Sequence, residues 1–212
     1  MIEKNIFDLY SNEYDLWFDE NPIIYNTELN AIKSILPKGR GIEIGVGTGR
    51  FAAGLNIKDG IEPSPNMRKI AVQRGINALP GVGEDMPFEE EVFDFALFVT
   101  SICFLQDINN TLAEVKRVLK KNGKIVIAFI DKQSPLGRVY ESKKNENHFY
   151  KNARFYSTEE LLSCLLKSGF CKFEVFQTLY GDIEKIKEVQ SLKTGYGKGG
   201  FVIIIGDVNG FI

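Results

Sequence analysis

The chain has 212 residues, of which 44% are hydrophobic and 25% are charged, and its formal net charge is −2. This composition fits one globular domain that buries a full core, and the small net charge argues against a nucleic-acid partner. The charged N-terminal segment 1–15 does not resemble a signal peptide, and the apolar runs are too short to span a bilayer. We therefore expect a cytoplasmic protein with no membrane or nucleic-acid partner.

The N-terminal residues 1–40 predict a helical cap over the rest of the domain. Two helical faces carry apolar residues: Tyr10, Tyr14, Trp17 and Phe18 on the first, and Tyr25, Leu29, Ile32 and Leu36 on the second. Such an aromatic face most often belongs to a core, but it also suits a lid that packs on a bound ligand.

Short apolar runs alternate with helical patterns after this cap. Strands are expected at 41–44, 59–62, 93–99 and 124–130, with a weaker one in "NALPG" (77–81), where Pro80 cannot donate to a ladder. Alternating strands and helices indicate a parallel sheet that is covered on both faces.

Two helices between these strands carry clear boundary signals. Ser64 is the expected N-cap of a helix that starts at Pro65 and stops at Gly75. A second amphipathic helix is expected around Ile108–Leu119, because its apolar residues recur at helical spacing.

The C-terminal region changes character. Ser157 and Glu160 predict a capping box at the start of a helix that Gly169 ends. The strand-like runs 171–180 and 199–207 are separated by a segment too short and too polar for a packed crossover helix. We therefore expect a doubly wound, Rossmann-like α/β sheet of seven strands, mostly parallel, with an antiparallel hairpin at one edge.

The stretch "GIEIGVGTGRFA" (41–52) predicts a strand, a glycine-rich turn and a helix. Its spacing is G-x-G-x-G, and Arg50 stands where a dinucleotide-binding motif has its third glycine. Glu43 places an acid before the turn. These features favour a ligand with a cationic end over a pyrophosphate.

Five stretches together resemble the motifs of class I S-adenosylmethionine-dependent methyltransferases, most closely the type 11 branch. They are "EIGVGTG", "GIEPSPNMRKIA", "GEDMPFEEEVFDFALF", "EVKRVLKKNGKIVIAF" and "FYSTEELLSCLLKSGF", in the order and spacing of that family. The resemblance covers roughly residues 30–206. It implies S-adenosyl-L-methionine as cofactor, S-adenosyl-L-homocysteine as product, and no metal.

The resemblance also implies a set of cofactor-binding residues: Glu43, Gly45, Gly47, Gly49, Glu62, Gly83, Glu84, Val99 and Thr100. Glu62 would accept hydrogen bonds from the ribose hydroxyls, and Glu43 would favour the cationic methionine end. Val82 departs from the family, which commonly has Asp or another polar residue there. Recognition of the adenine amino group would then fall to Glu84 or to backbone carbonyls.

A small-molecule acceptor is expected from two absences in the "VTSI" stretch after the fourth strand. It lacks the [DNS]PP[YF] motif that accompanies methylation of exocyclic amines in DNA or of glutamine. It also lacks the pair of glutamates found in arginine methyltransferases. The long polar segment 131–156 leaves the sheet where an acceptor would approach. Candidate acceptor-binding residues are Tyr14, Trp17, Arg138, Tyr150 and Arg154. The arginines would suit a carboxylate or phosphate, although a solvated loop explains them equally well.

No catalytic residue is assigned, because in-line methyl transfer mainly requires alignment and exclusion of water. Cys103 is read as a small buried residue rather than a nucleophile, and His148 as a loop residue. The three cysteines are scattered without a CxxC, which argues against a metal site or a disulfide framework.

The sequence thus predicts one methyltransferase domain: a cap (1–40), a cofactor-binding core (41–130), an acceptor or lid segment (131–156) and a C-terminal helix with an edge hairpin (157–212). Two alternatives stay open. One is a protein that binds S-adenosylmethionine without turnover, and the other is an NAD(P)-dependent oxidoreductase, which the glycine spacing disfavours. The acceptor, the methylated atom and the oligomeric state are left open.

Overall fold

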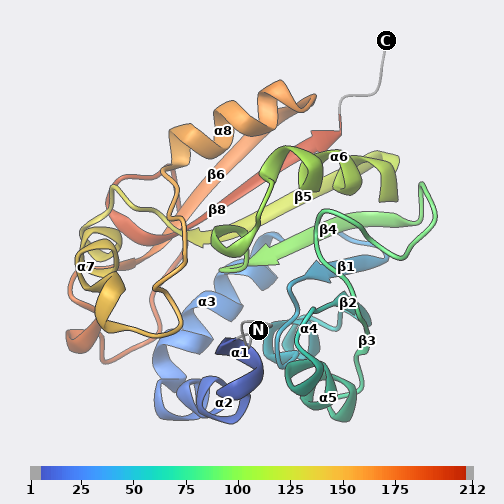
Figure 1. Cartoon of the computed structure of the whole chain (residues 1–212). Helices are drawn as coiled ribbons and strands as arrows, with labels where there is room; N and C mark the ends of the chain where they lie inside the picture. The colour runs from blue at the N-terminus through green and yellow to red at the C-terminus, as the bar shows by residue number, and fades with distance from the viewer. Residues whose placement is uncertain (1–5, 209–212) are drawn as a thin grey trace.

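The computed structural model describes residues 6–208, which form one eight-stranded sheet with helices on both faces (Figure 1). The strands are β1 (Gly41–Ile44), β2 (Asp59–Ile61), β3 (Asn77–Leu79), β4 (Phe93–Val99), β5 (Leu119–Ile130), β6 (Phe170–Tyr180), β7 (Lys193–Thr194) and β8 (Gly199–Val208). The α-helices are α1 (Ile6–Leu9), α2 (Ser11–Glu20), α3 (Pro22–Ile35), α4 (Arg50–Gly54), α5 (Pro65–Gln73), α6 (Ile108–Val118), α7 (Pro135–Lys143) and α8 (Thr158–Lys167). Short 3₁₀ turns are η1 (Ile102–Phe104), η2 (Lys144–Glu146) and η3 (Ile183–Lys185). The outermost parts of the expected cap (1–5) and C-terminal region (209–212) lie outside the described residues.

The strand order is β3-β2-β1-β4-β5-β8-β6-β7, and strands β1 to β5 run parallel. Strand β8 is antiparallel to both β5 and β6. The predicted fold class is confirmed, with one more strand than expected: the two-residue β7 pairs with β6 beyond the expected hairpin. A strand of two residues has no periodicity that a sequence can reveal. Strand β8 lies inside the sheet because it pairs with both β5 and β6, and β7 takes the edge position that β6 would otherwise hold.

Element boundaries agree closely with the sequence signals, with one shift. Strand β3 ends at Leu79, just before Pro80, and the Ser64 and Ser157 caps both form, the latter as a complete capping box. Strand β5 begins at Leu119 rather than at residue 124. Leu119 has the right spacing for the face of α6, but its backbone is already extended, with φ −78° and ψ 140°.

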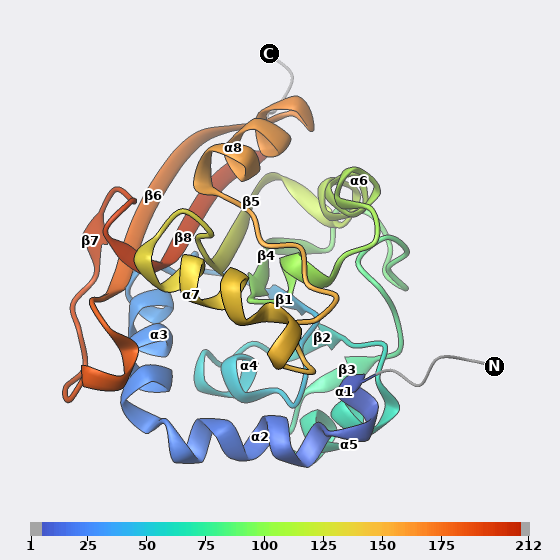
Figure 2. The ribbon, with the colours of Figure 1, turned by 60° about the vertical axis from the view of Figure 1, so that its left-hand side comes forward.

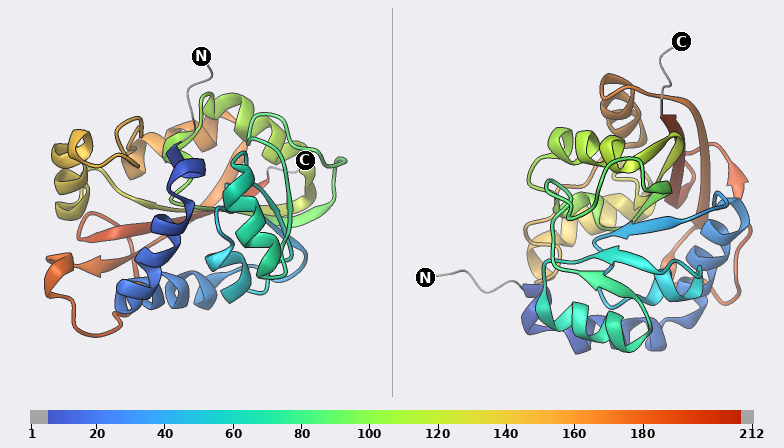
Figure 3. Two further views of the ribbon diagram at one scale, coloured as in Figure 1. Left: turned by 60° about the horizontal axis from the view of Figure 1, so that its bottom comes forward. Right: turned by 90° about the vertical axis from the view of Figure 1, so that its right-hand side faces the viewer.

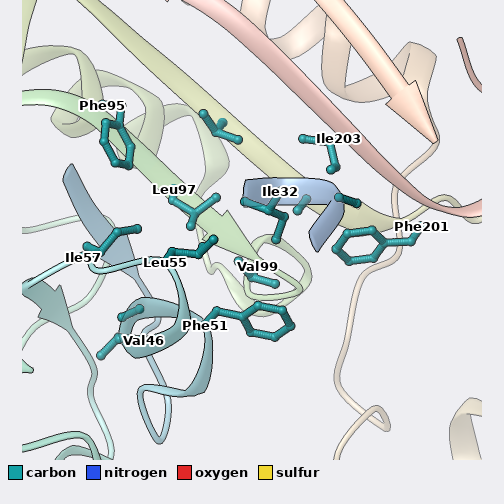
Figure 4. Close-up of a cluster of buried hydrophobic side chains, with 14 of the residues drawn as sticks. Ile32, Val46, Phe51, Leu55, Ile57, Phe95, Leu97, Val99, Phe201 and Ile203 are labelled. Atoms are coloured by element: carbon teal, nitrogen blue, oxygen red, sulfur yellow. The ribbon is translucent and has the colours of Figure 1, made fainter. Parts of the chain in front are cut away.

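Helices lie on both faces of the sheet (Figure 3), and apolar side chains form one buried layer on each face. In β4, Leu97 and Val99 face the layer of α3 and α4, whereas Phe98 faces the layer of α6 and α8. The same alternation continues in β5 and β8. Figure 4 shows the α3–α4 side, where Ile32 and Phe51 pack against Leu97, Val99 and the β8 side chains. Burial of both faces explains the continuous apolar runs of the central strands.

Helix α2 runs beside α4 and α5 (Figure 2). An ionic network holds it against the glycine turn and α5. Arg50 begins α4, and its guanidinium bonds the Asp15 carboxylate at 2.9 Å and Asp19 at 2.7 Å. Arg74, at the end of α5, also pairs with Asp15 at 2.6 Å. Partial burial disfavours the Asp15 anion, but the bonds from Arg50 and Arg74 outweigh it and hold its pKa well below the usual range. Arg50 stands where a dinucleotide-binding motif has its third glycine, and in this structure it holds α2 against the start of α4.

Within residues 6–208, no helix is long and apolar enough to cross a membrane.

We predict that Asp15→Asn lowers the free energy of unfolding by about 1–3 kcal/mol at pH 7, because two guanidinium groups lose a partly buried partner. Since the folded-state pKa of Asp15 is lowered, its contribution is present above the unfolded-state pKa of about 4 and fades as the pH falls below it. Urea unfolding of both proteins from pH 7 to pH 3 measures this difference.

Asp19→Asn is the matched control, because Asp19 binds the same guanidinium from a side chain that is 60% exposed. Its effect should be smaller and more sensitive to salt. Equal losses from both substitutions would contradict a special role for the partly buried carboxylate.

Candidate functional site

The strand order reverses between β1 and β4, and this point carries the glycine turn. In a parallel sheet, ligands bind beyond the carboxyl ends of the strands at such a reversal. Gly45 follows β1 and Thr100 follows β4, so the two loops face each other across the switch point. The N–H groups of Gly45 and Val46 donate to the carbonyl of Ile61, which joins the turn to the end of β2.

All three glycines of the turn adopt left-handed backbone, with φ values of +71° at Gly45, +53° at Gly47 and +80° at Gly49. A Cβ atom at Gly45 would lie 2.7 Å from the Cβ atom of Ser101. At Gly47 the nearest atom would be Cε1 of Tyr14, 3.7 Å away. Gly47 therefore leaves its backbone open to a ligand, beneath the ring of Tyr14.

Glu43 is a buried acid without a complete set of partners. Its side chain is on β1, the residue is 2% exposed, and Oε2 has no hydrogen-bond donor among the described residues. Burial, with a smaller contribution from the nearby Glu62 carboxylate, raises its pKa well above the usual value. Such an orphaned oxygen suits a ligand that brings a cation or a donor.

Glu62 follows β2 and holds the turn directly. Its Oε2 accepts from the N–H of Gly47 at 3.0 Å, and its Oε1 accepts from the N–H of Ser64 at 2.9 Å. Burial raises its pKa, and these two backbone donors partly oppose that shift. An ionised carboxylate has about four acceptor sites, so it retains room for two hydroxyl donors.

Asp8 of α1 covers the neighbouring start of α5. Its Oδ1 accepts from Oγ of Ser64 at 2.8 Å and from the N–H of Asn66 at 2.9 Å. The N-terminal helices thus reach the Glu62 side of the turn as well as the Arg50 side.

Gly83 and Glu84 lie in the loop after β3, beside the start of α6. Oε1 of Glu84 accepts from the N–H groups of Gln106 and Asp107, at 2.8 and 3.0 Å. A Cβ atom at Gly83 would lie 2.9 Å from Cγ2 of Thr111. Both residues therefore brace this loop against α6, and the adenine contacts expected of them remain a prediction.

Thr100 is a β-branched residue in strained, left-handed backbone, with φ +51°, directly after the buried Val99. Its carbonyl accepts from the thiol of Cys103 at 3.2 Å. Burial raises the pKa of Cys103 to about 12, so this residue remains a thiol near neutral pH. That argues against Cys103 as a nucleophile.

These residues fit the expected cofactor. The open backbone at Gly47, the orphaned oxygen of Glu43 and the spare acceptor sites of Glu62 lie around one turn. They offer acceptors for an ammonium or sulfonium end and for ribose hydroxyls. Among the residues that the structure describes, no cluster of His, Cys, Asp or Glu could hold a metal ion.

An aromatic cavity of about 390 Å³ adjoins the turn, and helices α1 to α3 and the segment 139–150 build most of its wall. It is lined by Phe7, Glu13, Tyr14, Trp17, Phe18, Glu20, Glu28, Phe51, Thr100, Phe104, Ile130, Val139, Tyr140, Lys143, Asn147, His148, Phe149 and Tyr150. Tyr14 and Thr100 belong both to this lining and to the surroundings of the glycine turn.

Ring contacts close the cavity between the N-terminal helices and the segment after α7. The ring of Phe149 lies 5.8 Å from that of Tyr14 and 5.6 Å from that of Phe7. At the mouth, Nε2 of His148 lies 3.3 Å from Oε1 of Glu13. Segments more than 100 residues apart in sequence thus share one wall.

The structure brings together three of the five predicted acceptor-binding residues: Tyr14, Trp17 and Tyr150 all line the cavity. Arg138 and Arg154 are exposed and are not part of its lining. The guanidinium of Arg154 instead stacks over the ring of Tyr156, at 4.9 Å from its centroid.

Glu28 is the charged, buried residue among the lining residues that the sequence did not predict. It is 6% exposed, and burial raises its pKa to about 8. A signal was present, because Glu28 follows Tyr25 by three residues and precedes Ile32 by four. It is therefore an acid within the apolar face of α3, a place where a helix ordinarily has an aliphatic side chain.

Comparisons with known proteins agree with this geometry. Residues 42–127 match a family model described as a methyltransferase domain. An uncharacterized protein of Methanocaldococcus jannaschii is 50% identical over 200 residues, which cover 94% of this chain and 97% of that protein.

Two solved structures extend the comparison to the whole fold. A Thermotoga maritima SAM-dependent methyltransferase, described as a possible histamine N-methyltransferase, has a TM-score of 0.94 and 49% identity over 96% of this chain and 99% of its own. A putative methyltransferase of Haloferax volcanii, in complex with the activator Trm112, has a TM-score of 0.75 and 16% identity over 98% and 99% of the chains. At that identity, the second likeness concerns the fold alone.

We predict that Glu28→Gln stabilises the protein above neutral pH. The folded-state pKa of Glu28 is raised, so the wild type binds an extra proton when folded and loses stability as the pH rises from about 4.5 to about 8. The variant has no such penalty. Its free energy of unfolding should exceed that of the wild type by roughly 2–4 kcal/mol at pH 8.5, and by much less at pH 5.

Urea unfolding at both pH values measures the effect, and Glu141→Gln, on the exposed surface of α7, is the control. A difference that does not depend on pH would contradict the burial of an ionisable Glu28.

Proposed function

The chain belongs to the class I S-adenosylmethionine-dependent methyltransferases, and we propose that it transfers the methyl group of this cofactor to a small-molecule acceptor. The observation that carries the acceptor class is the aromatic cavity, which adjoins the glycine turn at Tyr14 and Thr100. Its walls leave about 390 Å³, a volume suited to a metabolite-sized ligand.

The cofactor would lie across the switch point. Glu62 would accept hydrogen bonds from the ribose hydroxyls through its spare acceptor sites, and Glu43 would face the cationic methionine end. The open backbone at Gly47 would allow close approach. The loop of Gly83 and Glu84 lies after β3 and is available for the adenine, with Val82 as an exposed apolar neighbour.

The bound cofactor supplies an activated methyl group that leaves its sulfonium by in-line displacement. The protein's part is to align the acceptor and to exclude water, which the rings of Tyr14, Phe149 and Phe104 support by enclosing the cavity. Burial raises the pKa of Tyr14 well above its usual value, so its hydroxyl remains a neutral hydrogen-bonding group. We assign no general acid or base.

A small acceptor also agrees with the absence of a basic surface field, since the net charge is −2. The Thermotoga maritima relative points in the same direction, because histamine is a small molecule.

The direct test combines binding and turnover. We expect calorimetry to detect binding of S-adenosylmethionine and S-adenosylhomocysteine, and no binding of NAD or NADP. Incubation with methyl-labelled cofactor and a metabolite extract should yield a labelled small product, identified by mass spectrometry. Cofactor binding without labelled product from any extract would instead support a binding protein without turnover, and binding of NAD or NADP alone would support an oxidoreductase.

We predict that Glu62→Ala lowers the affinity for S-adenosylhomocysteine by about ten- to a few hundredfold, because two ribose hydroxyls lose a charged acceptor. Glu62→Gln should be little better, since one end of its amide would turn an NH₂ group toward the N–H of Gly47 or Ser64. Calorimetric titration measures both affinities. The exposed Glu89→Gln is the control, and wild-type affinity in both Glu62 variants would refute this assignment.

A further inference from the structure

Glu28 has no partner within the part of the chain that the structure describes. Its carboxyl group forms no hydrogen bond or ion pair with residues 6–208, although the residue is 6% exposed and lines the aromatic cavity. A buried carboxyl group without partners costs free energy in either protonation state. An aliphatic residue would serve the packing of α3 better, so the acid calls for a ligand that satisfies it.

The rings around Glu28 suit a positively charged ligand. Burial raises the pKa values of Tyr14, Tyr140 and Tyr150. Glu28 adds to the shift of each, but for Tyr14 the nearby Glu43 and Glu62 carboxylates contribute more than Glu28 does. All three therefore stay neutral phenols near pH 7 and lie within electrostatic reach of Glu28. Their electron-rich faces, with Trp17 on the same lining, attract cations.

The other charged groups of the lining do not supply a counterion for the Glu28 carboxyl group. Glu13, Glu20, Lys143 and His148 are all exposed, and Glu13 lies beside His148 at the mouth. Glu28 is thus the only buried carboxyl, amine or imidazole side chain in the described lining, so a positively charged ligand would find a partner there and no competing buried cation. An anionic acceptor would meet this acid without help from Arg138 or Arg154, which lie outside the lining.

Resting on the function proposed above, we propose that the methyl acceptor is a small organic amine whose protonated nitrogen pairs with the Glu28 carboxylate inside the aromatic cavity. This nitrogen has no lone pair while it is protonated, so it anchors the acceptor, and a different nucleophilic atom of the acceptor would take the methyl group. The geometry joins a buried, unpartnered acid, a wall of aromatic rings and an opening toward the cofactor turn at Tyr14. The pairing would satisfy Glu28, and the rings would replace part of the water around the cation.

Trp17 provides a direct readout of this pocket, because it is the only tryptophan of the chain and lines the cavity. Its fluorescence can be titrated, in saturating S-adenosylhomocysteine, with three probes of similar shape: 2-phenylethylamine, 2-phenylethanol and 3-phenylpropionate. We expect the cationic amine to bind about tenfold or more tightly than the neutral alcohol, and the anion to bind weakest.

Glu28→Gln keeps the shape of the side chain and removes its charge. We expect this substitution to lower the affinity for 2-phenylethylamine by about ten- to a hundredfold, while the affinity for 2-phenylethanol changes less than about twofold. S-adenosylhomocysteine affinity should be unchanged. Glu141→Gln, an exposed acid on α7, should leave all four affinities as in the wild type.

Four results would each overturn the amine assignment. The amine could fail to bind, bind no more tightly than the alcohol, or bind more weakly than 3-phenylpropionate. The fourth is an amine affinity that Glu28→Gln leaves unchanged. Calorimetry with S-adenosylhomocysteine separates this from the broader proposal. If the wild-type protein does not bind S-adenosylhomocysteine, the methyltransferase function is refuted. If it binds S-adenosylhomocysteine but does not prefer the amine, only the role of Glu28 is refuted.

Discussion

The hydrogen bond from the N–H of Gly47 to Oε2 of Glu62 joins the ends of β1 and β2 at the point where the sheet reverses its order. It holds a turn that only residues tolerant of positive φ can form, and the same carboxylate also fixes the start of α5 through Ser64. A Cβ atom at Gly47 would have only the ring of Tyr14 within 4 Å, so the Gly47 backbone is not covered by a neighbouring strand. The turn is therefore both a structural joint and a surface that a ligand can approach.

The remaining parts of the site depend on where this turn places α4. Arg50 begins that helix and reaches Asp15 and Asp19, which fixes α2 above the turn. With α2 in place, Tyr14 lies over Gly47, and its ring meets Phe149 of the segment after α7. One guanidinium thus links the cofactor turn to the wall of the cavity. A partly buried ion pair suits this task because it fixes orientation, even where its net contribution to stability is small.

Three carboxyl groups, those of Glu43, Glu62 and Glu28, are buried within or beside this site, and burial raises the pKa of each. A core built for stability alone would replace them with apolar side chains. Glu62 recovers part of the cost through two backbone donors, but Glu43 keeps an orphaned oxygen and Glu28 has no described partner. These three acids lower the stability of the fold, as residues in binding sites commonly do when they serve a ligand.

The sequence by itself determined the features that depend on local geometry. The glycine spacing, the serine caps and the apolar runs specify positive φ, helix starts and buried strands within a few residues of each signal, and they indicated the class I fold with its cofactor turn. Tertiary structure decided what depends on contacts between distant segments. It placed the short β7 beyond β6, left Arg138 and Arg154 outside the cavity, and brought Phe149 to Tyr14. It also decided the role of Glu28, because an acid on an apolar helix face becomes a buried carboxyl group without a partner only when α2 and the segment after α7 cover it.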